Sequence, residues 1–193
     1  MSEVGTHTPG PIDNKLGITD PNHINEFEAE GLIRAELFTF DLDEAVELNA
    51  QLILEIHHIG FGKLYEWGGR WRNIDVKVGK IHPPDPSRIP MLMYQFLDNL
   101  DFKVKHAKTF DDKVDAIAYA HHEYIKIHPF NNGNGRTGRL LMNLICLKYG
   151  YKPLTLYHKE GKSRRIYIDA LQAADHGDFS HLKNLIKEEL QLL

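Results

Sequence analysis

The sequence predicts an all-α protein with one small β-hairpin. Most segments of the 193-residue chain repeat apolar residues at helical spacing, and acidic residues or prolines stand where these segments begin. One segment, residues 74–78, alternates apolar and polar side chains as an edge strand does. The length suits one full core, so we expect a helical bundle at residues 40–193 behind an N-terminal extension at residues 1–39.

The N-terminal part is predicted to hold two helices behind an irregular arm. Residues 1–22 are rich in Gly, Pro, Asn and Thr and lack periodicity, which is typical of an arm or a surface wrap. Residues 24–36 predict a short helical or mixed segment. Residues 41–58 predict a strong helix, because acidic residues occupy its first turn and apolar residues follow on one face.

Proline and glycine divide the rest of the chain into helices. Glycines at residues 60–69 interrupt the helical pattern before the hairpin, and prolines at residues 83–90 mark a loop and a helix start. The remaining helices are expected at residues 91–104, 111–127, 140–149, 162–175 and 179–192. The chain contains no internal repeats.

Composition excludes several classes of partner. Acidic residues number 27 against 23 basic ones, so the chain has no electrostatic footprint for nucleic acid. No apolar run reaches membrane-spanning length and the polar N-terminus is not a signal peptide, so we expect no membrane partner. The single cysteine, Cys146, is expected to be a core residue, and cytoplasmic location follows as the default. The basic cluster at residues 159–165 is more typical of a solvated helix start than of phosphate contacts.

The most informative stretch runs from His128 to Arg139 and reads HPFNNGNGRTGR between two predicted helices. Gly133 and Gly135 let the backbone turn tightly, and the first N–H groups of the following helix attract anions. Arg136 and Arg139 share one helix face, and each can grip a phosphate through two N–H groups. The imidazole of His128 can accept a proton near neutral pH. These residues predict a phosphate cradle with a base beside it.

The same residues permit other interpretations. The stretch is not a P-loop, because it lacks Gly-Lys-Ser/Thr and a preceding strand, and it is not a dinucleotide fingerprint, because a helix precedes it. A plain interhelical turn with solvated or salt-bridged arginines is the alternative. Four further histidines do not have the spacing of a zinc helix, so we expect core or supporting roles for His57, His58, His121 and His122.

The whole string resembles the signature of the Fic family, His-Pro-Phe-x-(Asp/Glu)-Gly-Asn-Gly-Arg-x-x-Arg, with Asn132 at the usually acidic position. Residues 65–72 look like the Trp-x-Gly-x-Arg segment of that family, and residues 73–79 look like its hairpin flap. Residues 167–182 are similar to its closing helices, so the resemblance covers residues 40–190. Within the family, the N-terminal segment and Asn132 look most like the subfamily named mobile mystery protein B.

Fic proteins typically transfer AMP from ATP to a hydroxyl side chain of a protein, so the resemblance implies a protein adenylyltransferase. It implies that His128 is the general base for a Tyr, Ser or Thr hydroxyl, that Arg136 binds the β-phosphate side as a catalytic residue, and that Arg139 binds the γ-phosphate. The implied nucleotide-binding residues are Asn132, Gly133, Asn134 (with a side-chain amide to add), Gly135, Arg136, Arg139 and Tyr167. ATP with Mg²⁺ is the implied substrate, and Asn132 would be a weaker metal ligand than a carboxylate.

The resemblance also implies regulatory and docking residues. Glu30 stands where the family has an inhibitory glutamate that pairs with the second motif arginine, here Arg139, and blocks the γ-phosphate. Glu26 replaces the Ser/Thr that opens this inhibitory pattern, so the pattern is broken and Glu28 is a second candidate. A target segment would pair with the edge strand formed by Ile74, Asp75, Val76, Lys77 and Val78.

Three other functions stay open. A Fic protein could transfer UMP or phosphocholine instead of AMP, or the chain could be a weakly active nucleotide-binding regulatory or toxin module. A third possibility is a metal phosphohydrolase that uses the histidines as ligands. The sequence argues against it, because no aspartates are spaced regularly with these histidines. The sequence does not identify the target protein or decide whether the chain forms a homo-oligomer.

Overall fold

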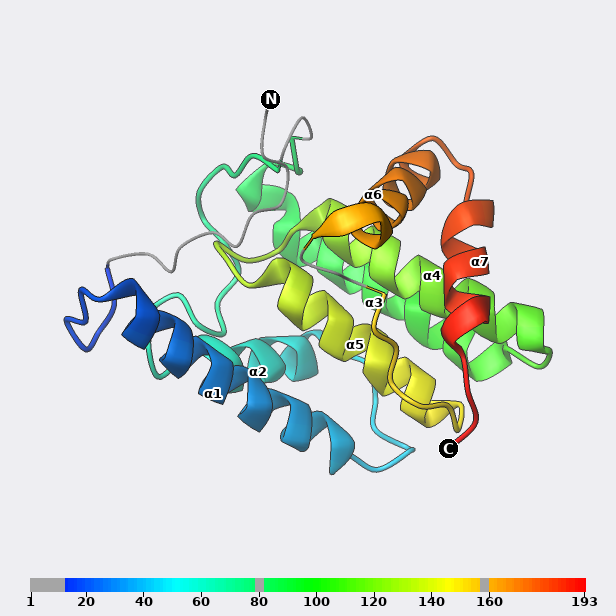
Figure 1. Ribbon diagram of the computed structural model, residues 1–193, viewed down its shortest axis with the longest axis horizontal. Coiled ribbons are helices and arrows are strands. Elements are labelled where there is room, and N and C mark those ends of the chain that lie inside the picture. Colours follow the sequence, from blue (N-terminus) through cyan, green and yellow to red (C-terminus); the bar gives the residue numbers. More distant parts are fainter. Residues whose placement is uncertain (1–12, 79–81, 157–159) are drawn as a thin grey trace.

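The computed structural model describes residues 13–78, 82–156 and 160–193, and within them the protein is helical, as predicted (Figure 1). The helices in the described ranges are α1 (Pro21–Phe40), α2 (Ala50–Phe61), the 3-10 helix η1 (Pro86–Arg88), α3 (Ile89–His106), α4 (Phe110–Ile127), α5 (Asn134–Lys148), α6 (Gly161–Asp175) and α7 (Ser180–Glu189). The last five, α3 to α7, confirm the helices expected from the sequence to within a few residues, apart from an earlier start of α5.

The two N-terminal helices differ from the prediction. Helix α1 spans 20 residues, begins after the cap Asp20, and takes up part of the expected arm. The helix expected over residues 41–58 begins only at Ala50, where the side chain of Asn49 accepts the N–H of Leu52 at 3.0 Å. Upstream, the carboxylate of Asp43 accepts the N–H of Ala45 at 2.7 Å, which stabilises a local turn in place of a first helical turn.

The expected edge strand is not formed over residues 74–77. These residues are irregular, Val78 alone takes part in a β-bridge, and residues 79–81 of the expected flap lie outside the described part of the chain. Alternating polarity predicts that Ile74 lies on the buried face, yet its side chain is half exposed, because alternation does not supply a partner strand. A side chain holds this stretch instead, since Arg72 Nη1 donates to the carbonyl of Ile74 at 2.9 Å.

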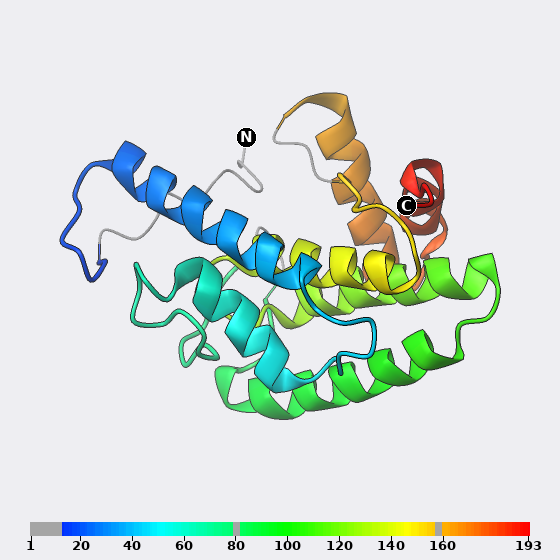
Figure 2. The same cartoon turned by 90° about the horizontal axis from the view of Figure 1, so that it is seen from below.

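Helix α5 lies between the α1–α2 pair and α4, while α6 and α7 pack against α4 (Figures 1 and 2). Fully buried apolar side chains on the central helices, such as Ile53, Ile117, Leu141 and Ile145, form the shared core. Burying one such side chain stabilises the fold by about 1.5–3 kcal/mol. The loop between α4 and α5 is therefore mounted on the most buried helices, within reach of α1 and α2. None of the helices in the described ranges has the length and apolar character needed to cross a bilayer.

Candidate functional site

Helix α4 ends at Ile127 and is capped by His128, whose backbone is left-handed with φ 52° and ψ 61°. Among the described residues it is the one non-glycine with positive φ. Pro129 follows, and a proline disfavours helical geometry in the residue before it. A left-handed conformation costs a side chain about 1–3 kcal/mol and persists only where neighbours enforce it. Here Arg72 Nε donates to the carbonyl of His128 at 2.8 Å, and the N–H of His128 donates to the carbonyl of Tyr124 at 3.0 Å.

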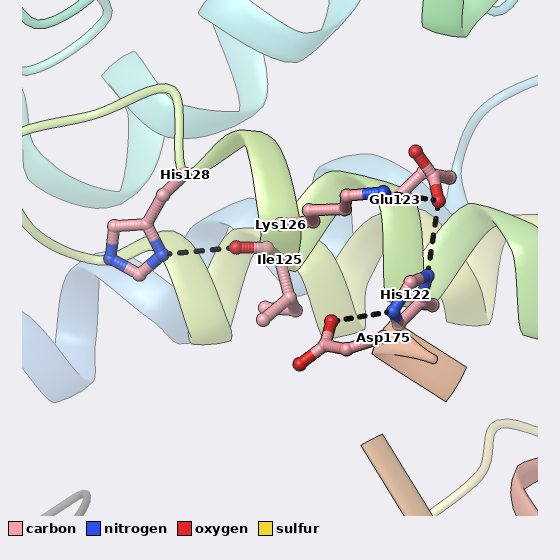
Figure 3. A network of polar contacts seen from close by, with 6 residues as sticks. All are labelled: His122, Glu123, Ile125, Lys126, His128 and Asp175. Carbon is pink, nitrogen blue, oxygen red and sulfur yellow. Dashed lines mark hydrogen bonds and ion pairs between the residues drawn. The ribbon is translucent and has the colours of Figure 1, made fainter. Parts of the chain in front are cut away.

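The imidazole of His128 has the protonation state that a general base requires. Nδ1 lies 3.3 Å from the carbonyl oxygen of Ile125 and donates to it, which leaves the lone pair on Nε2 (Figure 3). Burial, with a smaller contribution from the charge of Arg72, lowers the pKa of His128 from 6.5 to about 4. The ring is therefore neutral at pH 7, and Nε2 can accept a proton.

Asn134 closes the loop from inside. Its Oδ1 accepts the N–H of Phe130 at 2.8 Å, and its Nδ2 donates to the carbonyl of Phe130 at 2.8 Å. Phe130 is fully buried, as expected for an anchor, and Asn134 is buried with it. Both polar groups of this amide therefore bond the loop backbone, and the expected contact between the amide and a phosphate stays a prediction that depends on the second N–H of Nδ2. The backbone N–H of Asn134 is a further donor at this helix N-terminus.

Gly133 makes the turn into α5. Its φ is 76°, and a Cβ built on it would lie 2.5 Å from the ring of Phe61, so no larger residue fits. The side-chain Oδ1 of Asn132 accepts the N–H of Gly133 at 2.7 Å. Helix α5 then begins at Asn134, earlier than predicted, and its first intrahelical bond runs from the N–H of Thr137 to the carbonyl of Gly133 at 2.9 Å. The N–H groups before Thr137 form an anion site with the helix dipole.

Arg136 and Arg139 line one cleft of about 280 Å³ between α1, α5 and the segment after α5. This confirms that the two guanidinium groups share one face of α5. The other lining residues are Leu32, Glu36, Leu140, Asn143, Leu154 and Thr155. Two guanidinium groups in the lining of one cleft suit a ligand with several phosphate groups.

Glu28 of α1 pairs with one of the two arginines of this cleft. Arg136 Nη1 donates to Glu28 Oε2 while the guanidinium lies 4.6 Å from the centre of the Phe61 ring. Glu28 is only 2 % exposed, and its other oxygen accepts the hydroxyl of Tyr65 at 2.8 Å. Burial and the neighbouring Glu28 raise the pKa of Tyr65, so the hydroxyl keeps its proton and remains a donor.

Glu30, the first candidate from the sequence, lies elsewhere. Its side chain is 66 % exposed and pairs with Arg34 at 3.8 Å on the surface of α1. Residues 28 and 30 are about 200° apart around a helix, so only one of them can face α5. The expectation that Glu30 reaches Arg139 is wrong, and the buried carboxylate is that of Glu28, paired with Arg136.

Tyr167 and the histidines form polar contacts in the core. The hydroxyl of Tyr167 lies 2.7 Å from Nε2 of His121, and both residues are buried, so the role of Tyr167 in nucleotide binding stays a prediction. His122 joins α4 to α6, with Nδ1 3.1 Å from Glu123 Oε1 and Nε2 2.9 Å from Asp175 Oδ1 (Figure 3). These histidines hold helices together, which confirms their supporting role.

The sequence does not single out Arg72 as a residue of the site. Arg72 is 2 % exposed, and its guanidinium donates to the carbonyls of His128, Ile74 and Pro84. Its own N–H donates to the carbonyl of Pro129 at 2.8 Å. From the sequence, an arginine in a glycine-rich loop is expected to be exposed. The one feature of the sequence that could have indicated its burial is its place at the end of the aromatic run at residues 65–72.

Comparison with known proteins is consistent with this geometry. Residues 47–146 match the model of the Fic/DOC family. A protein adenylyltransferase Fic of Aedes aegypti is 40% identical over 127 residues, which is 65% of this chain and 24% of the relative. The chain thus spans about a quarter of the length of the curated relatives it matches.

Solved structures share the fold. BepC from Bartonella tribocorum, solved with bound AMPPNP, superposes with a TM-score of 0.69 at 20% identity, covering 98% of this chain and 95% of that one. Fic-1 from C. elegans superposes with a TM-score of 0.71 at 27% identity, covering 91% of this chain and 51% of that one.

Proposed function

The chain belongs to the Fic/DOC family, and from this membership we propose that it transfers AMP from ATP to a hydroxyl side chain of a target protein. The observation that carries the proposal is the placement of a neutral imidazole, His128, at the loop that leads into the N-terminus of α5. The curated relatives are named as adenylyltransferases, which supports the choice of AMP as the transferred group.

The proposed reaction is a displacement at the α-phosphorus of ATP. The hydroxyl oxygen of the target forms the new P–O bond, and its proton passes to Nε2 of His128. The bond between the α-phosphorus and the bridging oxygen breaks, and pyrophosphate leaves with that oxygen. Backbone N–H groups at Gly135 and its neighbours stabilise the charge on the α- and β-phosphate oxygens, and Arg136 and Arg139 hold the leaving group.

Magnesium enters this proposal as part of the MgATP substrate. The described residues include no group of three or more His, Cys, Asp or Glu side chains able to hold a metal ion. At the position expected to hold the ion, Asn132 offers one neutral oxygen, and that oxygen already accepts the N–H of Gly133. The donors at the loop therefore do not form a magnesium cage, and no step above depends on one.

We propose that residues 74–78 dock the target. This stretch is irregular, Ile74 is half exposed, and Arg72 bonds both Ile74 and His128. A target segment bound there would lie beside the residue that holds the base. We also propose a cytoplasmic location for the protein, which is the default for a chain whose single cysteine, Cys146, is a buried free thiol.

We also propose that α1 restrains nucleotide binding through Glu28. A carboxylate and a phosphate compete for the same N–H groups of a guanidinium. As long as Glu28 bonds Arg136, the β-phosphate contact is occupied, and ATP has to displace a buried ion pair. Weakening this pair should therefore increase transfer.

The test is a labelling assay with wild-type protein and a lysate that contains candidate targets. ATP labelled at the α-phosphate should label protein, and ATP labelled at the γ-phosphate should not. Parallel arms with labelled UTP and CDP-choline test the other transferable groups. Label from the γ-phosphate, or label only from UTP or CDP-choline, would contradict AMP transfer.

A further inference from the structure

His57, in the middle of α2, touches the motif loop at two points. Its side chain is fully buried, and its ring stacks on Phe130 with 3.5 Å between ring centres and 3° between planes. Its Nε2 lies 3.1 Å from the carbonyl oxygen of Asn132. One side chain thus contacts both the apolar anchor of the loop and the residue that precedes the glycine turn.

A second contact sets the tautomer of this ring. The N–H of Gly69 donates to Nδ1 of His57 at 2.9 Å, so Nδ1 must be unprotonated and the ring proton must sit on Nε2. Nε2–H therefore donates to the carbonyl of Asn132. Burial lowers the pKa of His57 to about 3, which agrees with a neutral ring. Gly69 has φ 81°, and a Cβ there would lie 2.6 Å from Cβ of His58, so the turn at residues 67–69 requires glycine.

The two hydrogen bonds at Asn132 hold opposite ends of one peptide unit. The carbonyl of Asn132 and the N–H of Gly133 belong to the same planar group. His57 bonds the carbonyl end, and the side chain of Asn132 bonds the N–H end at 2.7 Å. The orientation of this plane sets the φ of Gly133 and hence the direction in which α5 begins. Without such restraint a glycine permits the plane to rotate at little cost.

We infer that His57 is a positioning residue, which fixes the phosphate-binding turn through the carbonyl of Asn132 and has its tautomer set by Gly69. The inference rests on the nucleotide transfer proposed above. His57 touches no reacting atom in this assignment. Its effect passes through the peptide unit between Asn132 and Gly133, at the point where the helix N-terminus is aimed at the phosphates.

Two substitutions separate the hydrogen bonds of His57. In His57→Gln the side-chain nitrogen can occupy the place of Nε2 and still donate to Asn132. In His57→Asn the shorter side chain can occupy the place of Nδ1 and accept from Gly69, but it cannot reach Asn132. Both variants lose the ring stacked on Phe130, so the loss of this stacking affects the two equally. Thermal unfolding should therefore show similar stability for the two variants.

The rate of AMP transfer should distinguish the two variants. His57→Asn should slow transfer on the order of 10- to 100-fold, because misplacing a catalytic loop by about 1 Å can cost that much. His57→Gln should stay within about fivefold of wild type, since one retained hydrogen bond keeps the peptide unit in place. Equal rates in two variants of equal stability, or a faster His57→Asn, would overturn the inference.

A measurement without turnover tests the inference even if the protein transfers nothing. Nitrogen-15 NMR of wild-type protein should show the His57 ring as the Nε2–H tautomer with no titration between pH 5 and 8. The amide resonance of Gly133 should shift in His57→Asn and stay near its wild-type position in His57→Gln. A ring that carries its proton on Nδ1, or that titrates near pH 6.5, would remove the positioning role. Absent labelling by wild type, with these spectra as expected, would count against AMP transfer alone.

Discussion

The two ends of the loop between α4 and α5 are held by different kinds of contact. From His128 to Asn132, backbone carbonyls accept from neutral or buried side chains: Arg72 bonds the carbonyl of His128, and the neutral ring of His57 bonds the carbonyl of Asn132. At the arginine end, the buried contact is an ion pair between Arg136 and Glu28. The first end has no group that a substrate phosphate would replace, whereas the second holds a carboxylate where a phosphate could bind. The base is therefore preorganised, and the anion grip is exchangeable.

Replacing the base should produce the largest effect at the preorganised end. His128→Ala removes the group that accepts the hydroxyl proton, so labelling should fall on the order of a hundredfold or more. Calorimetric affinity for a nonhydrolysable ATP analogue should stay within a few-fold of wild type, because the phosphate contacts lie in α5. A variant that labels its target at the wild-type rate would move the base to another residue.

Replacing Arg136 should weaken phosphate binding at the arginine end of the loop. Arg136→Ala removes a charge-assisted grip on phosphate, which should weaken binding of the analogue by about 2–3 kcal/mol, or roughly 30- to 150-fold. Arg34→Ala is the control, because Arg34 is a surface arginine that pairs with Glu30. Calorimetric affinity that is equal in both variants would contradict the assignment of the cleft to phosphate.

Weakening the ion pair between Glu28 and Arg136 should increase nucleotide affinity and transfer, in contrast to the two substitutions above. Glu28→Gln keeps an acceptor for the Tyr65 hydroxyl and removes the carboxylate charge that pairs with Arg136, so ATP affinity and target labelling should rise by about tenfold, the scale of a typical coupling free energy. Glu30→Gln, on the exposed side of α1, should change neither. An unchanged labelling rate in Glu28→Gln would leave the pair as a structural contact between α1 and α5.

The sequence predicts the chemistry of this loop better than its packing. His128, Gly133 and the two arginines are recognisable because their residue types act at short, local spacing. Which of Glu28 and Glu30 faces α5 depends on how α1 is rotated about its own axis. Two glutamates two residues apart do not determine this rotation, so the sequence does not identify the buried one. Asn134 reads as a ligand contact in a glycine-rich stretch, yet its amide turns inward, because the buried backbone of Phe130 needs both a donor and an acceptor.

Asn132, at the position expected to contact the metal, allows a further test with a smaller expected effect on the rate. Asn132→Asp can still accept the N–H of Gly133 and adds a charge at a helix N-terminus, where a carboxylate is favoured. We expect a tighter dependence of labelling on Mg²⁺ and a rate increase of a few-fold, since a carboxylate is a stronger ligand for a hard cation than an amide oxygen. Identical Mg²⁺ titrations of the two proteins would show that residue 132 does not face the metal–phosphate complex.

The smallest effect is expected from a change of pH on the protonation of His128. It distinguishes the His128 end of the loop from the arginine end. An imidazole with the ordinary pKa of 6.5 would lose about three quarters of its neutral form between pH 8 and pH 6. Burial lowers the pKa of His128 to about 4, so its neutral, proton-accepting form should persist through this range and disappear only as the pH approaches 4. Because ATP itself titrates near pH 6.5, the measurement is an NMR titration of the His128 ring in the free protein, where the ring carbons should not shift between pH 6 and 8. The same depressed pKa makes the unfolded chain bind more protons than the native one between pH 6.5 and 4, so the free energy of unfolding should fall as pH is lowered through that interval. A His128 resonance that titrates near 6.5 would mean that the left-handed end of α4 is open to water, and that the base is no more preorganised than the arginines.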